Sequence, residues 1–203
     1  MVTLKVKVTF EEEVLGMANA NPEIHGDYIA SKAPNAKSME EELEAISCEE
    51  YIEKSMTIFP KDSHGNPGVW DYQWKGFFKD AFKSLKKIPK SECGKVKAYK
   101  QEIDGLIFVY PRFIPINVNG EIGHCQRPLR ASTMQGERVA LATSETVPAG
   151  SSVIFEIQML LDTHEKAVLE ALNYGKLRGF GQWRNSGKGR FTYEILERKE
   201  GEF

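Results

Sequence analysis

The aromatic residues between positions 70 and 87 constrain the fold most strongly. In the segment WDYQWKGFFKDAFKSLKK, apolar residues recur at i, i+3, i+4, i+7, i+8 and i+11, and these are Trp74, Phe77, Phe78, Ala81, Phe82 and Leu85. This spacing lines them up along one side of an α-helix. A row of large rings is far more typical of a core face than of a ligand site. We therefore predict a helix that Asp71 caps, that ends before Pro89 and that packs its aromatic side on another layer.

Alternating patterns on both sides of this helix predict β-strands. Residues 4–10 alternate apolar residues with Lys and Thr, as in a strand with one buried face. Similar patterns predict strands over residues 103–110, 112–118, 138–143, 151–160 and 190–196. Asn119-Gly120 is typical of a two-residue hairpin turn and follows one of these strands.

Two further helices are predicted from their capping signals. Ser38 and Glu41 form a capping-box pattern at the start of residues 38–55, and a helix over 162–175 begins at Asp162-x-x-Glu165. The order of elements is strand, helices, several strands, helix, strand. It indicates an α+β fold with helices packed on an antiparallel sheet, and a ferredoxin-like (RRM-like) βαββαβ core fits it. We expect one domain over residues 1–203, with an insertion at 15–70 that carries the acidic helix.

The composition excludes several classes of protein. The 203 residues are 41% hydrophobic and 28% charged, as in folded globular proteins. No apolar run approaches the roughly 18 residues that a membrane span needs, so we expect no membrane association. Three widely spaced cysteines favour reduced thiols and a cytoplasmic location over a disulfide framework or a zinc site. His124-Cys125 lacks further ligands nearby, and we expect neither a metal nor a cofactor.

Charge is unevenly distributed, although the net charge is only −2. Residues 40–53 are acidic and contain no base. Residues 75–100 contain nine lysines against Asp80 and Glu92, and residues 174–191 contain five bases and no acid. Two separate basic segments in a mildly acidic chain favour a nucleic-acid ligand, although each alone would suit an ordinary solvated face.

The second basic segment contains a glycine-rich loop, predicted over residues 175–190. It follows a helix and precedes a strand, the reverse of a dinucleotide-binding motif. Gly189 also takes the place of the hydroxyl residue of a phosphate-binding P-loop. The glycines allow backbone amides to approach phosphate oxygens, and nearby cations and Trp183 suit an unpaired nucleotide. The alternative is a connecting loop whose Trp183 packs back on the core.

The loop sequence EALNYGKLRGFGQWRNSGKGRF resembles the C-terminal glycine-rich loop of the RAMP (repeat-associated mysterious protein) superfamily, the RNA-binding subunits of CRISPR systems. Two earlier segments are similar to family motifs and occur in family order. QWKGFFKDAF at 73–82 resembles the KG-type helix start, and SETVPAGSSVIFEIQML at 144–160 resembles a strand entry. The resemblance is nearest to the backbone subunits that coat a guide RNA.

This resemblance implies a modified ferredoxin-like fold that binds single-stranded RNA near the helix and the loop. Together with the loop chemistry and the basic segment 125–140, it gives these candidate RNA-binding residues: Lys75, Lys79, Lys83, Arg127, Arg130, Arg178, Gly179, Gly181, Trp183, Arg184, Gly187, Lys188 and Arg190. Single-stranded DNA is an alternative ligand, because only a 2′-hydroxyl contact separates the two sugars. The family also implies that the protein assembles side by side, either with further copies of itself or with CRISPR subunits. A further interpretation is that the protein is a stand-alone relative of these subunits, encoded by a phage.

Catalysis is a separate hypothesis. Some members of the family cleave RNA with a histidine, or with an aspartate in the loop after the first strand, and here His25 and Asp27 lie in that region. Ordinary polar loop residues would look the same, and we favour a binding protein over an endoribonuclease. A third alternative is a protein-interaction module that mimics a CRISPR subunit.

Overall fold

The computed structural model describes residues 1–19, 56–133 and 136–201, with the backbone alone at Asn19, over 129–133 and over 136–141. The helix predicted over 38–55 and the candidate residues His25 and Asp27 lie outside the described residues.

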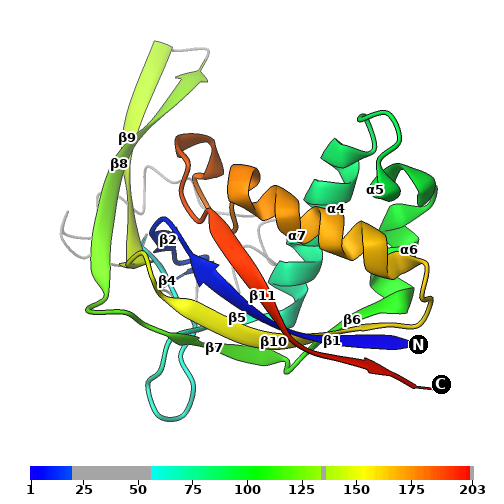
Figure 1. The fold of residues 1–203 in the computed structure, drawn as a ribbon. Helices are drawn as coiled ribbons and strands as arrows, with labels where there is room; N and C mark the ends of the chain where they lie inside the picture. Colours follow the sequence, from blue (N-terminus) through cyan, green and yellow to red (C-terminus); the bar gives the residue numbers. More distant parts are fainter. Residues whose placement is uncertain (20–55, 134–135, 202–203) are drawn as a thin grey trace, which may run out of the picture.

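A six-stranded sheet forms the base of the molecule (Figure 1). Its main path runs in the order β11 (Phe191–Glu200), β1 (Val2–Phe10), β10 (Ser152–Met159), β7 (Phe113–Asn117) and β5 (Gly68–Trp70). Strand β6 (Ile107–Tyr110) pairs with the other half of β10. All of these pairings are antiparallel.

This order confirms the ferredoxin-like prediction. Strand β1 leads to helix α4 (Asp71–Leu85), β6 and β7 share one strand position beside β10, and helix α7 (His164–Arg178) leads to β11. The sequence of elements is therefore βαββαβ, and the first and third strands lie side by side at the centre. The protein is an α+β fold with helices packed on an antiparallel sheet.

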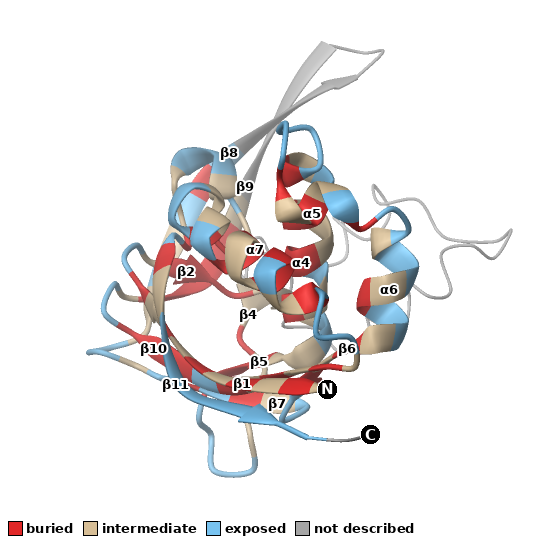
Figure 2. Ribbon diagram, turned by 45° about the vertical axis from the view of Figure 1, so that its right-hand side comes forward, coloured by how far each residue is buried: buried red, intermediate tan, exposed pale blue. Residues whose placement is uncertain are grey.

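The core lies between the sheet and the two long helices. Residues of β1 alternate between buried and half-buried, so one face of the sheet meets the helices. The buried side of α4 carries the six apolar residues of the predicted stripe, and the sequence interpretation of that stripe is confirmed. Figure 2 shows the buried residues gathered on the facing sides of helix and sheet. The ring of Trp74 lies 4.4 Å from that of Phe155 on β10, centroid to centroid.

Two short helices were not predicted. Helix α5 (Glu92–Lys95) and helix α6 (Tyr99–Leu106) follow α4. The predicted strand over 103–110 is therefore wrong for residues 103–106, where only the part from Ile107 is extended. A short apolar run fits both helix and strand periods. Packing of Ile103 into the core beside α4 selects the helix here.

The boundaries of the last helix also differ from the prediction. Helix α7 runs over His164–Arg178 rather than 162–175 and ends at Gly179, whose N–H donates to the Gly175 carbonyl at 3.0 Å. The glycine-rich loop therefore comprises residues 179–190. It contains one 3₁₀ turn, η1 (Arg184–Ser186).

A second sheet stands beside the first. Its path is β2 (Val14–Leu15), β9 (Gly136–Val147), β4 (Thr57–Ile58) and β3 (Ala18–Asn19), and β8 (Gly123–Thr133) pairs with β9 in a long hairpin. The hairpin predicted at Asn119-Gly120 is wrong, because β7 pairs with β5 and β10 and not with β8. The glycine-rich loop lies between the β8–β9 hairpin and α7 (Figure 1).

Candidate nucleic-acid interface

Two glycines fix the path of the glycine-rich loop. Gly179 and Gly189 have φ values of 75° and 71°, in the left-handed region. A Cβ on Gly189 would lie 1.9 Å from the Phe180 carbonyl oxygen, and one on Gly179 would lie 2.4 Å from that of Lys188. The Phe180 N–H donates to the Gly189 carbonyl at 2.8 Å across the neck of the loop. These glycines are thus required for the structure of the loop itself.

Phe180 anchors the loop, and Trp183 does not. The Phe180 ring is buried and stacks on Trp74 with 4.3 Å between centroids. Trp183 is 41% exposed, with a φ of 52° that non-glycine residues rarely adopt. The alternative in which Trp183 packs on the core is therefore wrong. An exposed aromatic residue held in an uncommon backbone conformation is typical of a functional position.

Most of the cations of the loop region are paired with carboxylates. Asp80 on α4 accepts from both Arg178 Nε at 3.0 Å and Arg184 Nη1 at 2.8 Å, at the same oxygen. Lys188 pairs with Glu13, at the turn after β1. The predicted basic loop is therefore an arrangement of positioned ion pairs. Arg190 is exposed, and its carbonyl accepts from the N–H groups of Glu11 and Glu12.

Arg127 on β8 is the exception. Its side chain is only 8% exposed, yet among the described residues its Nε and Nη1 have no hydrogen-bond partner. Its Nη2 donates to Gln182 Oε1 at 2.7 Å, and its guanidinium lies 5.3 Å from the centre of the Trp183 ring. A buried guanidinium with two unused donors is costly unless an anion accepts from it.

These residues line one hollow of about 360 Å³. Its walls are Arg127, Arg178, Gly181, Gln182, Trp183, Arg184 and Asn185. Three guanidinium groups meet here with one carboxylate, that of Asp80. The hollow therefore keeps an excess of positive charge beside an exposed aromatic ring.

None of the predicted lysines of α4 is among the residues that line this hollow. Lys79 pairs with Asp104 of α6 at 2.6 Å, and Lys75 donates to the Asp104 carbonyl at 3.2 Å. The Lys75 ammonium also lies 4.7 Å from the centre of the Phe108 ring, and burial lowers its pKa although Asp104 opposes this shift. Lys83 is exposed. RNA binding by these three lysines stays a prediction.

The sequence interpretation missed Asp80 and Gln182. Asp80 carried a signal, because it is an isolated acid among the lysines of residues 75–91. Nothing in the sequence distinguished Gln182. The side chain of Arg130 lies outside the described residues, so its predicted role is not located. Within the described ranges, no group of three or more His, Cys, Asp or Glu could hold a metal ion, and no helix is long and apolar enough to cross a membrane.

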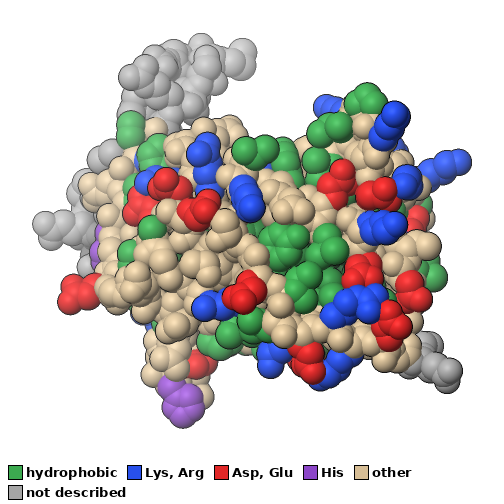
Figure 3. Space-filling view, in the orientation of Figure 1, with side chains coloured by type: hydrophobic (Ala, Val, Ile, Leu, Met, Phe, Trp, Pro, Cys, Tyr) green, Lys and Arg blue, Asp and Glu red, His purple; other side chains and the backbone are tan. Residues whose placement is uncertain are grey.

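On the face that Figure 3 shows, acidic and basic side chains are intermingled. Basic side chains gather at the end where Figure 1 labels α5.

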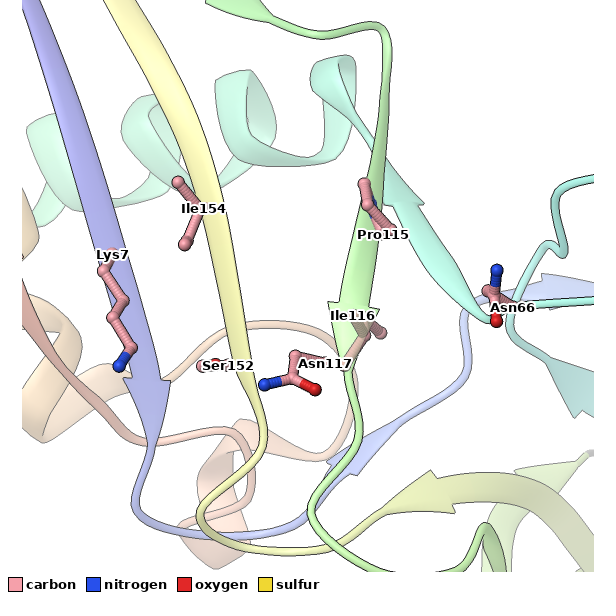
Figure 4. A pocket seen from close by; sticks show the side chains of 7 residues that line it. All are labelled: Lys7, Asn66, Pro115, Ile116, Asn117, Ser152 and Ile154. Carbon is pink, nitrogen blue, oxygen red and sulfur yellow. The ribbon is translucent and has the colours of Figure 1, made fainter.

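A second hollow, of about 330 Å³, lies on the face of the main sheet that points away from helices α4 and α7 (Figure 4). Lys7 and Ile154 pair across β1 and β10 there, on the side away from Val6 and Val8. Its walls are Lys7, Asn66, Pro115, Ile116, Asn117, Ser152 and Ile154. With one cation and no aromatic ring, this hollow suits a phosphate strand less well than the one beside Trp183.

No protein-family model and no curated protein sequence matches the chain. Solved structures that match it at the level of fold include the following two. One is a cryo-EM structure of the Type III-B Cmr-beta bound to cognate target RNA, with a TM-score of 0.53 and 10% identity over 98% of this chain and 60% of that one. The other is a Type IV-B CRISPR complex, with a TM-score of 0.50 and 9% identity over 97% and 90%.

The chain thus spans 60% of the length of the Cmr-beta chain that it matches. At these identities the likeness concerns the fold alone. The protein has a fold like that of subunits of CRISPR complexes.

Proposed function

We propose that the protein is a single-stranded RNA-binding protein of the RAMP type, which holds the phosphate backbone at the glycine-rich loop. The observation that carries this proposal is Arg127, a residue of the hollow beside Trp183 whose buried Nε and Nη1 have no hydrogen-bond partner among the described residues. A phosphodiester oxygen would accept from Nε and Nη1 and remove the cost of burying them unpaired.

Trp183 favours a single strand over a duplex. One face of its ring lies toward the Arg127 guanidinium, and the side chain is partly exposed. An unpaired base can stack on such a ring, whereas the bases of a duplex are already stacked on one another. Phosphate and base contacts then lie within one hollow.

The comparisons support an RNA ligand and a protein assembly. One matched structure is bound to target RNA, and both belong to CRISPR complexes. We infer that this chain works beside similar subunits or further copies of itself. The glycine-rich loop is the part that we expect to meet the RNA. Cleavage by His25 or Asp27 would be a further property, and nothing in the described residues favours it.

The test is binding of a labelled single-stranded RNA of about 10 nucleotides, measured by fluorescence anisotropy. Replacing Arg127 by Met keeps the volume and removes the charge. We expect affinity to fall by about tenfold to a hundredfold, because a hydrogen bond to a charged partner contributes about 1.5–3 kcal/mol.

The matched control is Arg112→Met. Arg112 Nη1 lies 3.5 Å from Asp71 Oδ2, and the Arg112 side chain is 76% exposed. Arg112 is not among the residues that line the hollow. We expect this variant to bind as the wild type does. Equal affinities of the Arg127 variant and the wild type would refute the proposal. A parallel series with DNA of the same length tests whether the 2′-hydroxyl is read.

A further inference from the structure

A group of lysines surrounds α5, beyond the C-terminal end of α4. All of its members are exposed, and they are Lys86, Lys87, Lys90, Lys97 and Lys100. We refer to this group as the α5 lysine surface. Lys86 Nζ donates to the Lys97 carbonyl at 3.5 Å, which joins the end of α4 to the segment before α6. The five lysines therefore belong to one corner of the molecule, where Figure 3 shows basic side chains gathered.

The carboxylates near this surface are already engaged. Glu92 pairs with Lys95 at 2.6 Å. Glu170 on α7 accepts from the Ser91 hydroxyl and from the Cys93 N–H, each at 2.8 Å. Among the described residues, no carboxylate lies within ion-pair distance of the five lysines. Their positive charge is thus not compensated locally.

Helix stabilisation does not account for this charge. Lysines at the C-terminal end of α4 would interact favourably with the helix dipole, and this explains Lys86. Lys97 and Lys100, however, lie just before and within the first turn of α6 (Tyr99–Leu106). A cation at a helix N-terminus is unfavourable, so these two lysines oppose helix stability rather than support it.

The α5 lysine surface continues the line of the proposed RNA site along α4. Asp80 marks the point at which α4 meets the loop arginines. Lys83 follows at i+3 on the same side of α4, and Lys87 lies in the turn just beyond the end of the helix at Leu85. The five residues from Asp80 to Leu85, at 1.5 Å each, give a span of about 8 Å. A stacked strand covers this distance with roughly three nucleotides.

We propose that the α5 lysine surface binds the phosphates of the RNA strand as it leaves the glycine-rich loop. This inference rests on the proposed function for the identity of the ligand. It gives the RNA a second contact region, which only a long strand can reach. A long strand should therefore bind with higher affinity than a short one. Exposed lysines with uncompensated charge suit this role because they bind a backbone without reading its bases.

The test compares two single-stranded RNAs, of about 6 and about 20 nucleotides, over a series of salt concentrations. The variant Lys87→Gln/Lys90→Gln removes two charges of the surface. The matched control Lys5→Gln/Lys7→Gln removes two charges from β1, on the face of the main sheet away from the helices. Circular dichroism checks that both variants are folded.

We expect the surface variant to bind the short RNA as the wild type does. Its affinity for the long RNA falls toward the short-RNA value, and the slope of log K against log salt decreases by about 1.4, or about 0.7 for each lost contact to a single strand. The β1 control leaves both RNAs unchanged.

Three outcomes would overturn the inference. In the first, the long RNA binds the surface variant as it binds the wild type. In the second, both RNAs weaken equally in the surface variant and in the β1 control. In the third, polyglutamate binds at these lysines while RNA shows no length effect, which would assign the surface to an acidic protein partner.

The Arg127→Met variant separates this inference from the proposed function. If it loses the short RNA while the lysine variant binds both RNAs normally, the proposed function stands and the inference fails. If it binds both RNAs normally while the lysine variant loses the long one, the lysine surface stands and the proposed loop site fails.

Discussion

The glycine-rich loop and the α5 lysine surface are both basic, but they hold their charges in opposite ways. In the loop region, Arg178, Arg184 and Lys188 are held by carboxylates of other elements. The five lysines of the α5 lysine surface have no carboxylate partner among the described residues. One region therefore has fixed geometry and reduced charge, and the other has full charge and little fixed geometry.

This difference assigns different tasks to the two regions. Guanidinium groups held in place lose little entropy when an anion arrives, so they select the position of a phosphate. Flexible lysines attract a polyanion over a longer range and bind it with a strong salt dependence. We expect the loop to set where the strand lies, and the α5 lysine surface to set how fast and how tightly a long strand binds.

The largest effect is expected where the loop geometry itself is broken. In Gly189→Ala, the new Cβ meets the Phe180 carbonyl at 1.9 Å and the residue keeps a φ of 71°. We expect a loss of about 2–4 kcal/mol in the free energy of unfolding, from left-handed strain and displacement of the backbone. Urea denaturation measures it.

Gly187→Ala is the control for this prediction. Gly187 has a φ of 86°, but the atoms nearest to a Cβ there belong to the flexible side chain of Arg190, at 3.4 Å or more. We expect a cost of about 1 kcal/mol. If the two variants were equally stable, the neck of the loop would not be rigid and the contrast between the two regions would be lost.

The next effect concerns Asp80, which reduces the charge of the loop. In Asp80→Asn the two arginines lose their shared carboxylate. Their positive charge is then uncompensated, like that of the α5 lysine surface. We expect RNA affinity to rise about fivefold with a steeper salt dependence, and stability to fall by at most about 1 kcal/mol because both pairs are partly exposed. Anisotropy titration and thermal melting measure the two quantities.

Asp104→Asn is the matched control, because it also removes a negative charge next to α4. Asp104 pairs with Lys79 and not with the loop arginines. We expect unchanged binding of a short RNA. Weaker binding by Asp80→Asn would mean that Asp80 mainly positions the arginines, and that fixed geometry contributes more to affinity than free charge.

Much of the fold could be predicted from local pattern. The alternation in β1 fits only the period of a strand, and the aromatic spacing of α4 fits only the period of a helix. The structure has both elements at these positions. One failure lies where a pattern fits two periods. Residues 103–106 read equally well as strand or helix, and only their packing against α4 decides between them.

The candidate site was less accessible to sequence reasoning, because its pairings are long-range. Asp80 meets Arg178 across 98 positions, and Arg127 meets Gln182 across 55. Composition revealed that the loop was basic, but not that its charges were already paired. The unused donors of Arg127 depend on burial, which neither the residue type nor its neighbours indicated.

The smallest predicted effect concerns the support beneath the α5 lysine surface. Burial would raise the pKa of Glu170, but hydrogen bonds from the Cys93 N–H and the Ser91 hydroxyl outweigh it and hold the pKa below its ordinary value of 4.5. A lowered pKa in the folded state adds stability above the ordinary pKa, and this stability is lost as pH falls through the folded value. We therefore expect Glu170→Gln to melt about 2 °C lower than the wild type at neutral pH, with the difference closing as the pH falls through the lowered pKa of Glu170.

Glu165→Gln separates this support from a general effect of removing a carboxylate from α7. A hydrogen bond from Arg198 lowers the pKa of Glu165, so its variant should show a similar pH dependence of melting. Glu165 contacts β11 through Arg198, whereas Glu170 holds the N-terminus of α5. Only the Glu170 variant should therefore also weaken binding of the long RNA, because the lysines on either side of α5 lose their common support. If both variants bound the long RNA alike, α5 would not need to be held in place, and the lysine surface would act through its charge alone.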